Sequence, residues 1–153
     1  MLQSTIDYLI IALQTITDIE NVFQVLPFAK TDAELHQYFE DSTNNDARIQ
    51  AWEISNISST ENRENAGNVI EWQHIIQIQG FLSLDYDDPN GPAQQMQTWI
   101  DAIKLLFLND NKLGKTVNSR GALRHLLNQP DLFYNRLCHH SVFELPVTTK
   151  HAL

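Results

Sequence analysis

The stretch VIEWQHIIQIQGFLSL, residues 69–84, decides the fold of this chain. Apolar side chains recur at every second position, from Ile70 and Trp72 through Ile76 to Leu82, and the positions between them are mostly polar. A period of two, in a stretch rich in β-branched and aromatic residues, is typical of a long β-strand with one buried face. We therefore predict one long strand whose apolar face another element covers.

A dense run of turn-forming residues, Asp85–Pro92, follows this strand and reads DYDDPNGP. Pro92 suits the first turn of a helix, where the missing N–H leaves no hydrogen bond unmade. Beyond it, apolar side chains recur at helical spacing from Met96 and Trp99 to Phe107, which predicts a helix of roughly four to five turns. The helix is expected to lie back across the apolar face of the strand.

The remaining patterns predict an α+β fold, with a mostly antiparallel sheet and two main helices packed on one face. The other predicted elements of the first half are an amphipathic helix from Leu2 to about Thr17, a short strand at Val22–Leu26, a short helix over Thr31–Phe39 that opens with a capping box, a strand at Arg48–Ile57 and a long, mobile hairpin loop at Asn56–Asn68.

The last third of the chain has a weaker pattern. Leu113–Val117 is interpreted as a short strand. The structure of Asn118–Asp131 stays open, because its leucines permit one helical turn that a glycine and a proline bracket closely. Tyr134–Thr149 contains two successive alternations of apolar residues, which predict a final strand with an irregularity between them.

Length and composition predict one domain over residues 1–153. No apolar run reaches the roughly 18 residues of a membrane-spanning helix. The N-terminal segment, which Asp7 interrupts, lacks the basic start and small-residue cleavage site of a signal peptide. We expect a soluble protein that is not secreted. The single cysteine, Cys138, excludes an intramolecular disulfide.

The formal net charge is −9, and it is unevenly divided along the chain. Residues 1–103 hold three basic and sixteen acidic side chains, whereas residues 104–153 hold seven basic and three acidic ones. The bland interpretation is a chance asymmetry among solvated loops. The sharper interpretation is that faces of opposite charge meet between subunits.

Two patterns invite a metal site, and neither supports one. In the turn at residues 85–91, the best calcium-loop register would place Tyr86 at the first ligand position and Gln97 at the twelfth, so two essential carboxylates are missing. In Cys138-His139-His140, adjacent residues of a strand face opposite ways, which disfavours chelation of one ion. We predict no metal and no cofactor.

His74 lies on the apolar face of the central strand, between Trp72 and Ile76. A histidine there is more often a hydrogen-bonded core or interface residue than a catalytic one, and no serine or cysteine motif marks a nucleophile beside it. The sequence also lacks a phosphate-binding loop, a dinucleotide fingerprint and a zinc-protease pair. We predict no enzyme activity and no catalytic residues.

The layout of the chain resembles the tail terminator proteins of long-tailed bacteriophages and prophages. Three segments carry this resemblance: LQSTIDYLIIALQTI (residues 2–16), IEWQHIIQIQGFLSLDYDDPNGPAQQMQTWIDAIKLLFLND (70–110) and SVFELPVTT (141–149). It covers most of the chain and rests on the order of the elements rather than on a motif. The short helix at residues 31–39 and the basic region at 112–124 have no counterpart in this layout.

The resemblance implies a structural virion protein, assembled in the cytoplasm of a bacterial host. Such a protein forms a homo-oligomeric ring, expected to be a hexamer, that caps the tail tube protein and joins it to the head connector protein, with DNA only as passing cargo. The candidate interface residues are Glu61, Arg63, Glu64, Asp85, Asp87, Asp88, Lys112, Lys115, Arg120 and Arg124.

Other classes of function remain open. A small nucleic-acid-binding protein would use Lys112, Lys115, Arg120, Arg124 and Arg136, but few aromatic residues lie among them and the rest of the chain is acidic. An enzyme or ligand carrier would hold His74 in a pocket of the sheet. An adaptor domain with an unknown partner is the remaining alternative.

Overall fold

The computed structural model describes residues 2–41, 48–62, 69–84, 88 and 90–152. Within these ranges the chain has an α+β fold, with three helices and a mixed, mostly antiparallel six-stranded sheet. The elements in chain order are α1 (Leu2–Gln14), β1 (Val22–Phe23), α2 (Asp32–Phe39), β2 (Gln50–Asn62), β3 (Val69–Ser83), α3 (Asn90–Leu106), β4 (Ser119–Arg120), β5 (Arg124–Phe133) and β6 (Arg136–Ala152).

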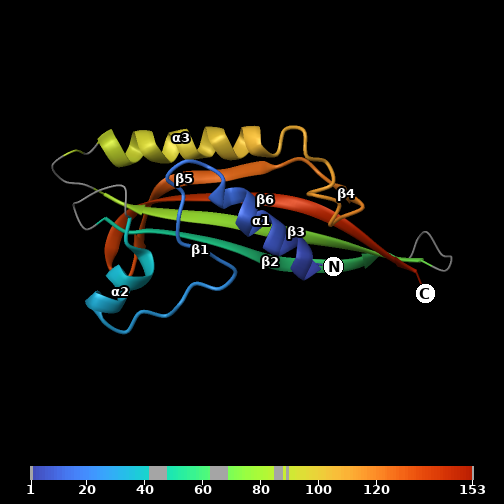
Figure 1. Cartoon of the computed structure of the whole chain (residues 1–153), viewed down its shortest axis with the longest axis horizontal. Helices are drawn as coiled ribbons and strands as arrows, with labels where there is room; N and C mark the ends of the chain where they lie inside the picture. Colours follow the sequence, from blue (N-terminus) through green and yellow to red (C-terminus); the bar gives the residue numbers. More distant parts are fainter. Residues whose placement is uncertain (1, 42–47, 63–68, 85–87, 89, 153) are drawn as a thin grey trace.

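Three long antiparallel strands, β2, β3 and β6, form the centre of the sheet. β1 extends the edge beside β2 and makes the parallel pair of the sheet. Along the other edge, β5 pairs with the first half of β6 and β4 pairs with Val147 and Thr148. Figure 1 shows α2 at one end of these strands, and the chain termini with β4 at the other.

Alternate residues of the central strands face opposite sides of the sheet, and both sides are covered. One side carries Trp52, Ile54, Ile76, Ile78 and Phe143, which pack against buried residues of α1 and α3. The predicted pair of helices on one face is thus confirmed. The other side packs against α2 at one end of the sheet, through Ala51, Phe81, Phe133, Cys138 and the α2 residues Leu35 and Phe39.

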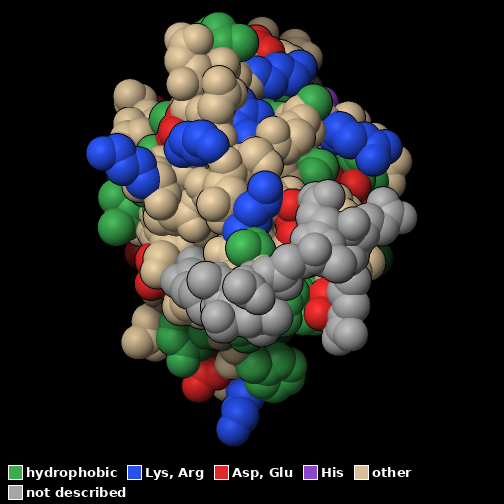
Figure 2. Space-filling model, turned by 90° about the vertical axis from the view of Figure 1, so that its right-hand side faces the viewer, with side chains coloured by type: hydrophobic (Ala, Val, Ile, Leu, Met, Phe, Trp, Pro, Cys, Tyr) green, Lys and Arg blue, Asp and Glu red, His purple; other side chains and the backbone are tan. Residues whose placement is uncertain are grey.

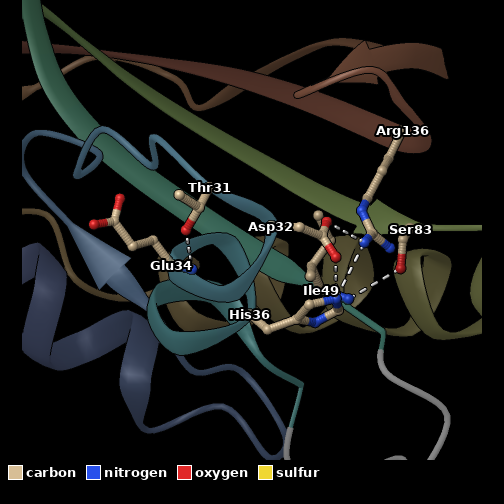
Figure 3. Close-up of polar contacts among 7 residues, drawn as sticks. All are labelled: Thr31, Asp32, Glu34, His36, Ile49, Ser83 and Arg136. Atoms are coloured by element: carbon tan, nitrogen blue, oxygen red, sulfur yellow. Dashed lines mark hydrogen bonds and ion pairs between the residues drawn. The ribbon is translucent and has the colours of Figure 1, made fainter.

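The short helix α2 begins as its capping box predicts. Thr31 is the N-cap, and its hydroxyl accepts a hydrogen bond of 3.1 Å from the N–H of Glu34. Arg136, at the start of β6, reaches across to α2 and donates to the Asp32 carboxylate at 2.8 Å (Figure 3). This hydrogen bond holds the pKa of the Asp32 carboxyl below its ordinary value.

Two predictions for the hairpin and the final strand were wrong. β2 continues to Asn62, so residues 56–62 are strand rather than loop, while residues 63–68 lie outside the described part. The polar composition of this segment reflects an exposed edge strand. The irregularity predicted in the last strand is absent from the continuous pairing of β6 with β3. The two alternations of apolar residues arise because the first part of β6 buries side chains on one face of the sheet and the second part buries them on the other face.

The segment between α3 and β6 also differs from the prediction. Leu113–Val117 forms turns rather than a strand, and Leu113, Gly114 and Lys115 all have positive φ, which a strand does not accommodate. Residues 118–131 hold no helix: they form β4 and most of β5. Tyr134 and Asn135, both with positive φ, then make the tight turn from β5 to β6.

In the described ranges, no helix combines the length and the apolar character that crossing a membrane would need.

Replacing Trp99, a fully buried residue of α3, by Ala should lower the free energy of unfolding by about 3–5 kcal/mol. Leu105→Ala, on the same helix but at a side chain that is 70% exposed, should change it by less than about 0.5 kcal/mol. Urea unfolding followed by circular dichroism measures both. Equal midpoints for the two variants would show that the buried face of α3 is misassigned.

Candidate functional site

Two surfaces of opposite charge lie toward opposite ends of the molecule. We call residues 18–41 the acidic surface, because this segment presents Asp18, Glu20, Asp32, Glu34 and Glu40, with Asp41 buried beneath them, against one basic residue, Lys30. We call residues 104–120 the basic surface, because it holds Lys104, Lys112, Lys115 and Arg120 against one acidic residue, Asp110. Figure 1 shows α2, within the acidic surface, at the end opposite β4.

The basic surface is built from the last turn of α3 and the turns that lead into β4. Figure 2 looks onto this end and shows Lys and Arg side chains gathered in its upper half, on the side of α3. The lone carboxylate of the segment, Asp110, accepts hydrogen bonds from the hydroxyl of Tyr8 and from the N–H of Gly114. The exposed lysines, Lys104, Lys112 and Lys115, therefore dominate the charge of this surface.

Arg120 has a structural task within the basic surface. Its guanidinium donates to the carbonyls of Phe107, Asp110 and Gly121, with the Asp110 contact at 2.8 Å. Phe107 follows directly on Leu106, the last residue of α3, and Asp110 lies three residues further along the turn. A cation there also suits the helix dipole. Arg120 thus closes the C-terminal end of α3.

The acidic surface is organised around α2 and the loop that precedes it. Val25 and Phe28 in this loop are 76% and 73% exposed, which is unusual for large apolar side chains. Phe28 lies beside Tyr134, in the turn between β5 and β6, with ring centroids 6.3 Å apart. Two large apolar side chains this exposed on one loop are typical of a contact surface.

The candidate interface residues lie on separate parts of the molecule. Glu61 lies near the end of β2, at the end of the molecule where β4 lies, and Asp88 precedes α3, where its carboxylate accepts from the N–H of Gly91 at 3.1 Å. Arg124 opens β5 and forms an ion pair of 3.8 Å with Glu144. Only Lys112, Lys115 and Arg120 lie together. The other predicted interface residues, Arg63, Glu64, Asp85 and Asp87, fall outside the described part of the chain.

His74 lines a hollow of about 330 Å³ at the same end of the molecule as the basic surface. The other lining residues are Leu2, Ser59, Trp72, Thr149 and His151. Two hydroxyl groups hold the imidazole: that of Ser59 lies 2.7 Å from Nδ1 and that of Thr149 lies 3.1 Å from Nε2. Burial, with a contribution from His151, lowers the pKa of His74, so the ring is neutral at pH 7.

The arrangement around His74 favours binding over catalysis. A catalytic triad pairs one ring nitrogen of its histidine with a carboxylate, whereas both nitrogens of His74 face hydroxyl groups. Trp72 and His74 lie nearly parallel, at an angle of 13° and with centroids 6.4 Å apart. Parallel aromatic rings and a leucine make an apolar lining, which suits an apolar or aromatic group.

Sequence reasoning found His74 but missed its partner Ser59. The pairing of β2 with β3 shifts register between Asn56 and Ser58, leaving one extra residue, Ile57, in β2. This bulge moves Ser59 onto the face of the sheet that His74 occupies. Only the pairing register, which the composition of an edge strand does not specify, would have revealed this.

Cys138, His139 and His140 do not converge on one point. Cys138 is buried against Phe81 and Phe133, while the His140 ring stacks on Phe81 and bonds to Asp131 and Gln79. Among the residues that the structure describes, no group of three or more His, Cys, Asp or Glu side chains is placed to hold a metal ion.

No protein-family model matches the chain, and no curated protein matches it either.

Because Arg120 closes α3, Arg120→Ala should cost about 2 kcal/mol in the free energy of unfolding, as expected when partly buried carbonyls are deprived of charged hydrogen bonds. Arg124→Ala removes one long, exposed ion pair and should cost less than about 1 kcal/mol. Thermal and urea unfolding of both variants measures the difference. Equal stability of the two variants would show that the hydrogen bonds of Arg120 do not stabilise the end of α3.

Proposed function

We propose that this chain is a structural virion protein of the tail terminator kind. It would assemble with copies of itself into a ring that caps the tail tube and joins it to the head connector. The proposal requires no catalytic group and no cofactor. The observation that carries it is the placement of two oppositely charged surfaces toward opposite ends of one subunit.

Charge placed in this way favours head-to-tail association. When unlike surfaces of one chain bind each other, each copy keeps one surface for the next copy, and the series closes into a ring if the rotation permits. Opposite charges steer such contacts and disfavour contacts between like surfaces. Two copies placed antiparallel across a two-fold axis would also bring unlike surfaces together, but both contacts would then form within the pair and no further copy could bind.

The order of elements supports the same proposal. A first amphipathic helix, a long hairpin of β2 and β3, a second long helix and closing strands follow the layout on which the resemblance to tail terminators rests. The structure adds α2 and its charged neighbours to that layout. The net charge of −9 also suits a ring through which DNA passes without being retained, since phosphates are repelled by an acidic protein.

Reversing one charge of the basic surface should weaken assembly. Lys115→Glu places a carboxylate where the proposal expects the acidic surface of the next copy, so the association constant should fall about tenfold. Assembly of the wild type should also weaken as salt is raised, because the charges are exposed. Light scattering coupled to size-exclusion chromatography measures both effects.

Lys30→Glu is the matched control, since Lys30 is also an exposed lysine and its reversal changes the net charge by the same amount. It lies within the acidic surface, so its reversal should leave assembly unchanged or strengthen it. If both variants weakened assembly equally, the cause would be the change in net charge rather than the position of the lysine. A wild type that stays monomeric at high protein concentration and low salt would contradict the ring.

A second candidate function, binding of nucleic acid, is favoured by the gathering of Lys and Arg in Figure 2. The geometry weakens it, because Arg120 bonds to three carbonyls and Arg136 bonds to Asp32. Few aromatic side chains lie among the remaining lysines, whereas binding of single strands relies on stacking.

A gel-shift titration at two salt concentrations distinguishes the two functions. The ring proposal predicts negligible binding of free duplex DNA by the wild type at physiological salt. Submicromolar binding that falls with salt would favour the second candidate instead. In that case the double variant Lys112→Ala with Lys115→Ala should bind more weakly, and its salt slope should fall by about one unit for each phosphate that is no longer neutralised.

A further inference from the structure

The exposed Phe28 is held in place rather than free to fold back. Tyr134 secures the next residue, because its hydroxyl accepts from the N–H of Ala29 at 3.0 Å and donates to the carbonyl of Pro27 at 3.4 Å. On the other side, the N–H of Leu26 donates to the Glu53 carboxylate at 3.2 Å. A phenyl ring fixed on a short loop loses little conformational freedom when it binds, which makes it a good anchor.

The hollow at His74 offers the matching receptor at the other end of the sheet. It lies next to the basic surface, because Asn118 accepts from the Lys150 N–H at 2.7 Å and bonds to the Thr148 carbonyl at 2.9 Å, on either side of Thr149. Lys112 in turn donates to the carbonyl of Asn118. An aromatic group that entered the hollow would therefore bring its own surroundings against exposed lysines.

The C-terminal half of the edge strand β5 is poorly suited to pairing with a strand of another copy. In the hairpin that Phe133 and Arg136 close, Pro130 and Leu132 direct their backbone nitrogens away from β6. Pro130 has no N–H, and the N–H of Leu132 is bonded to the Asp131 carboxylate at 2.8 Å. These two features hinder strand addition along this part of β5.

We propose that Phe28 of one copy enters the hollow lined by Leu2, Ser59, Trp72, His74, Thr149 and His151 of the next copy, with the acidic surface of the first against the basic surface of the second. This inference rests on the proposed ring and names the contact that builds it. Where this contact is made head to tail, each pair of copies keeps one free Phe28 and one free hollow that can bind further copies.

A second hollow at the same end is a poorer receptor. It measures about 230 Å³ and is lined by Lys104, Phe107, Leu108, Arg120 and Leu123. Two cationic side chains line it, whereas the His74 hollow presents stacked rings and hydroxyls. A phenyl ring gains more from the lining of the His74 hollow, because no Lys or Arg side chain there has to lose its water when the ring binds. This second hollow serves as the control position.

Disulfide trapping tests the contact directly. The double variant Phe28→Cys with Ser59→Cys should form a ladder of covalently linked copies under mild oxidation, while equal amounts of the two single variants, mixed, should give linked pairs. The control variant Phe28→Cys with Leu108→Cys should remain unlinked. The chain's own Cys138 does not interfere, because it is buried and burial raises the pKa of its thiol to about 12.

A truncation measures the strength of the same contact. Phe28→Ala should weaken association roughly 30-fold, as expected for an aromatic anchor at the centre of an interface. Ile11→Ala removes a side chain of similar exposure, 65%, from α1, outside both charged surfaces, and should leave association unchanged. Thermal unfolding of both variants verifies that they are folded.

The outcomes separate this contact from the ring itself. Linked ladders in the Ser59 variant, absent from the Leu108 control, support the contact. Assembly of the wild type without linkage in the Ser59 variant overturns the contact and leaves the ring standing. Linkage through Leu108 instead places Phe28 in the second hollow and overturns the assignment. A monomeric wild type overturns both the ring and this contact.

Discussion

The close approach of Trp52 to Gly80 is the contact on which the rest of the structure depends. A Cβ at residue 80 would lie 2.5 Å from Cζ3 of Trp52, so only glycine lets the indole of β2 lie flat across β3. The indole then meets Trp99 of α3 edge to face, with centroids 5.8 Å apart. The indole N–H of Trp99 donates to the carbonyl of Thr17, just beyond α1, at 3.2 Å. One glycine thus allows the hairpin, α3 and the end of α1 to share one core.

The two ends of the sheet, on either side of this core, carry different surfaces. At one end, Gln50, which is fully buried beneath Trp52, bonds to the carbonyl of Asp18 and to the Asp41 carboxylate and so ties the acidic surface to β2. At the other end, β2, β3 and β6 run past the core, and the hollow at His74 forms between them and the start of α1. The long strands therefore separate two unlike surfaces by the length of the sheet, which is the geometry that head-to-tail association needs.

Elements with one buried face could be predicted from the sequence, whereas edge elements could not. The alternation in β3 and the helical spacing in α3 report burial directly, and both were predicted within a few residues. β5 is mostly exposed and contains Pro130, so it carries no such signal. The charge division was also readable, but its meaning changed with the structure: Arg120 bonds to backbone carbonyls, which no side-chain pattern reveals. The hollow at His74 depends on the bulge at Ile57, and Phe28 stands out only because its exposure is known.

The central claim is that unlike ends of one chain bind each other, and the symmetry of the assembly tests it most directly. Negative-stain electron microscopy of the purified wild type at low salt, with native mass spectrometry of the same sample, gives both the symmetry and the copy number. The account predicts closed rings with a single rotational axis and more than two copies, with six expected from the resemblance to tail terminators. Monomers, or closed dimers with a two-fold axis, would contradict it.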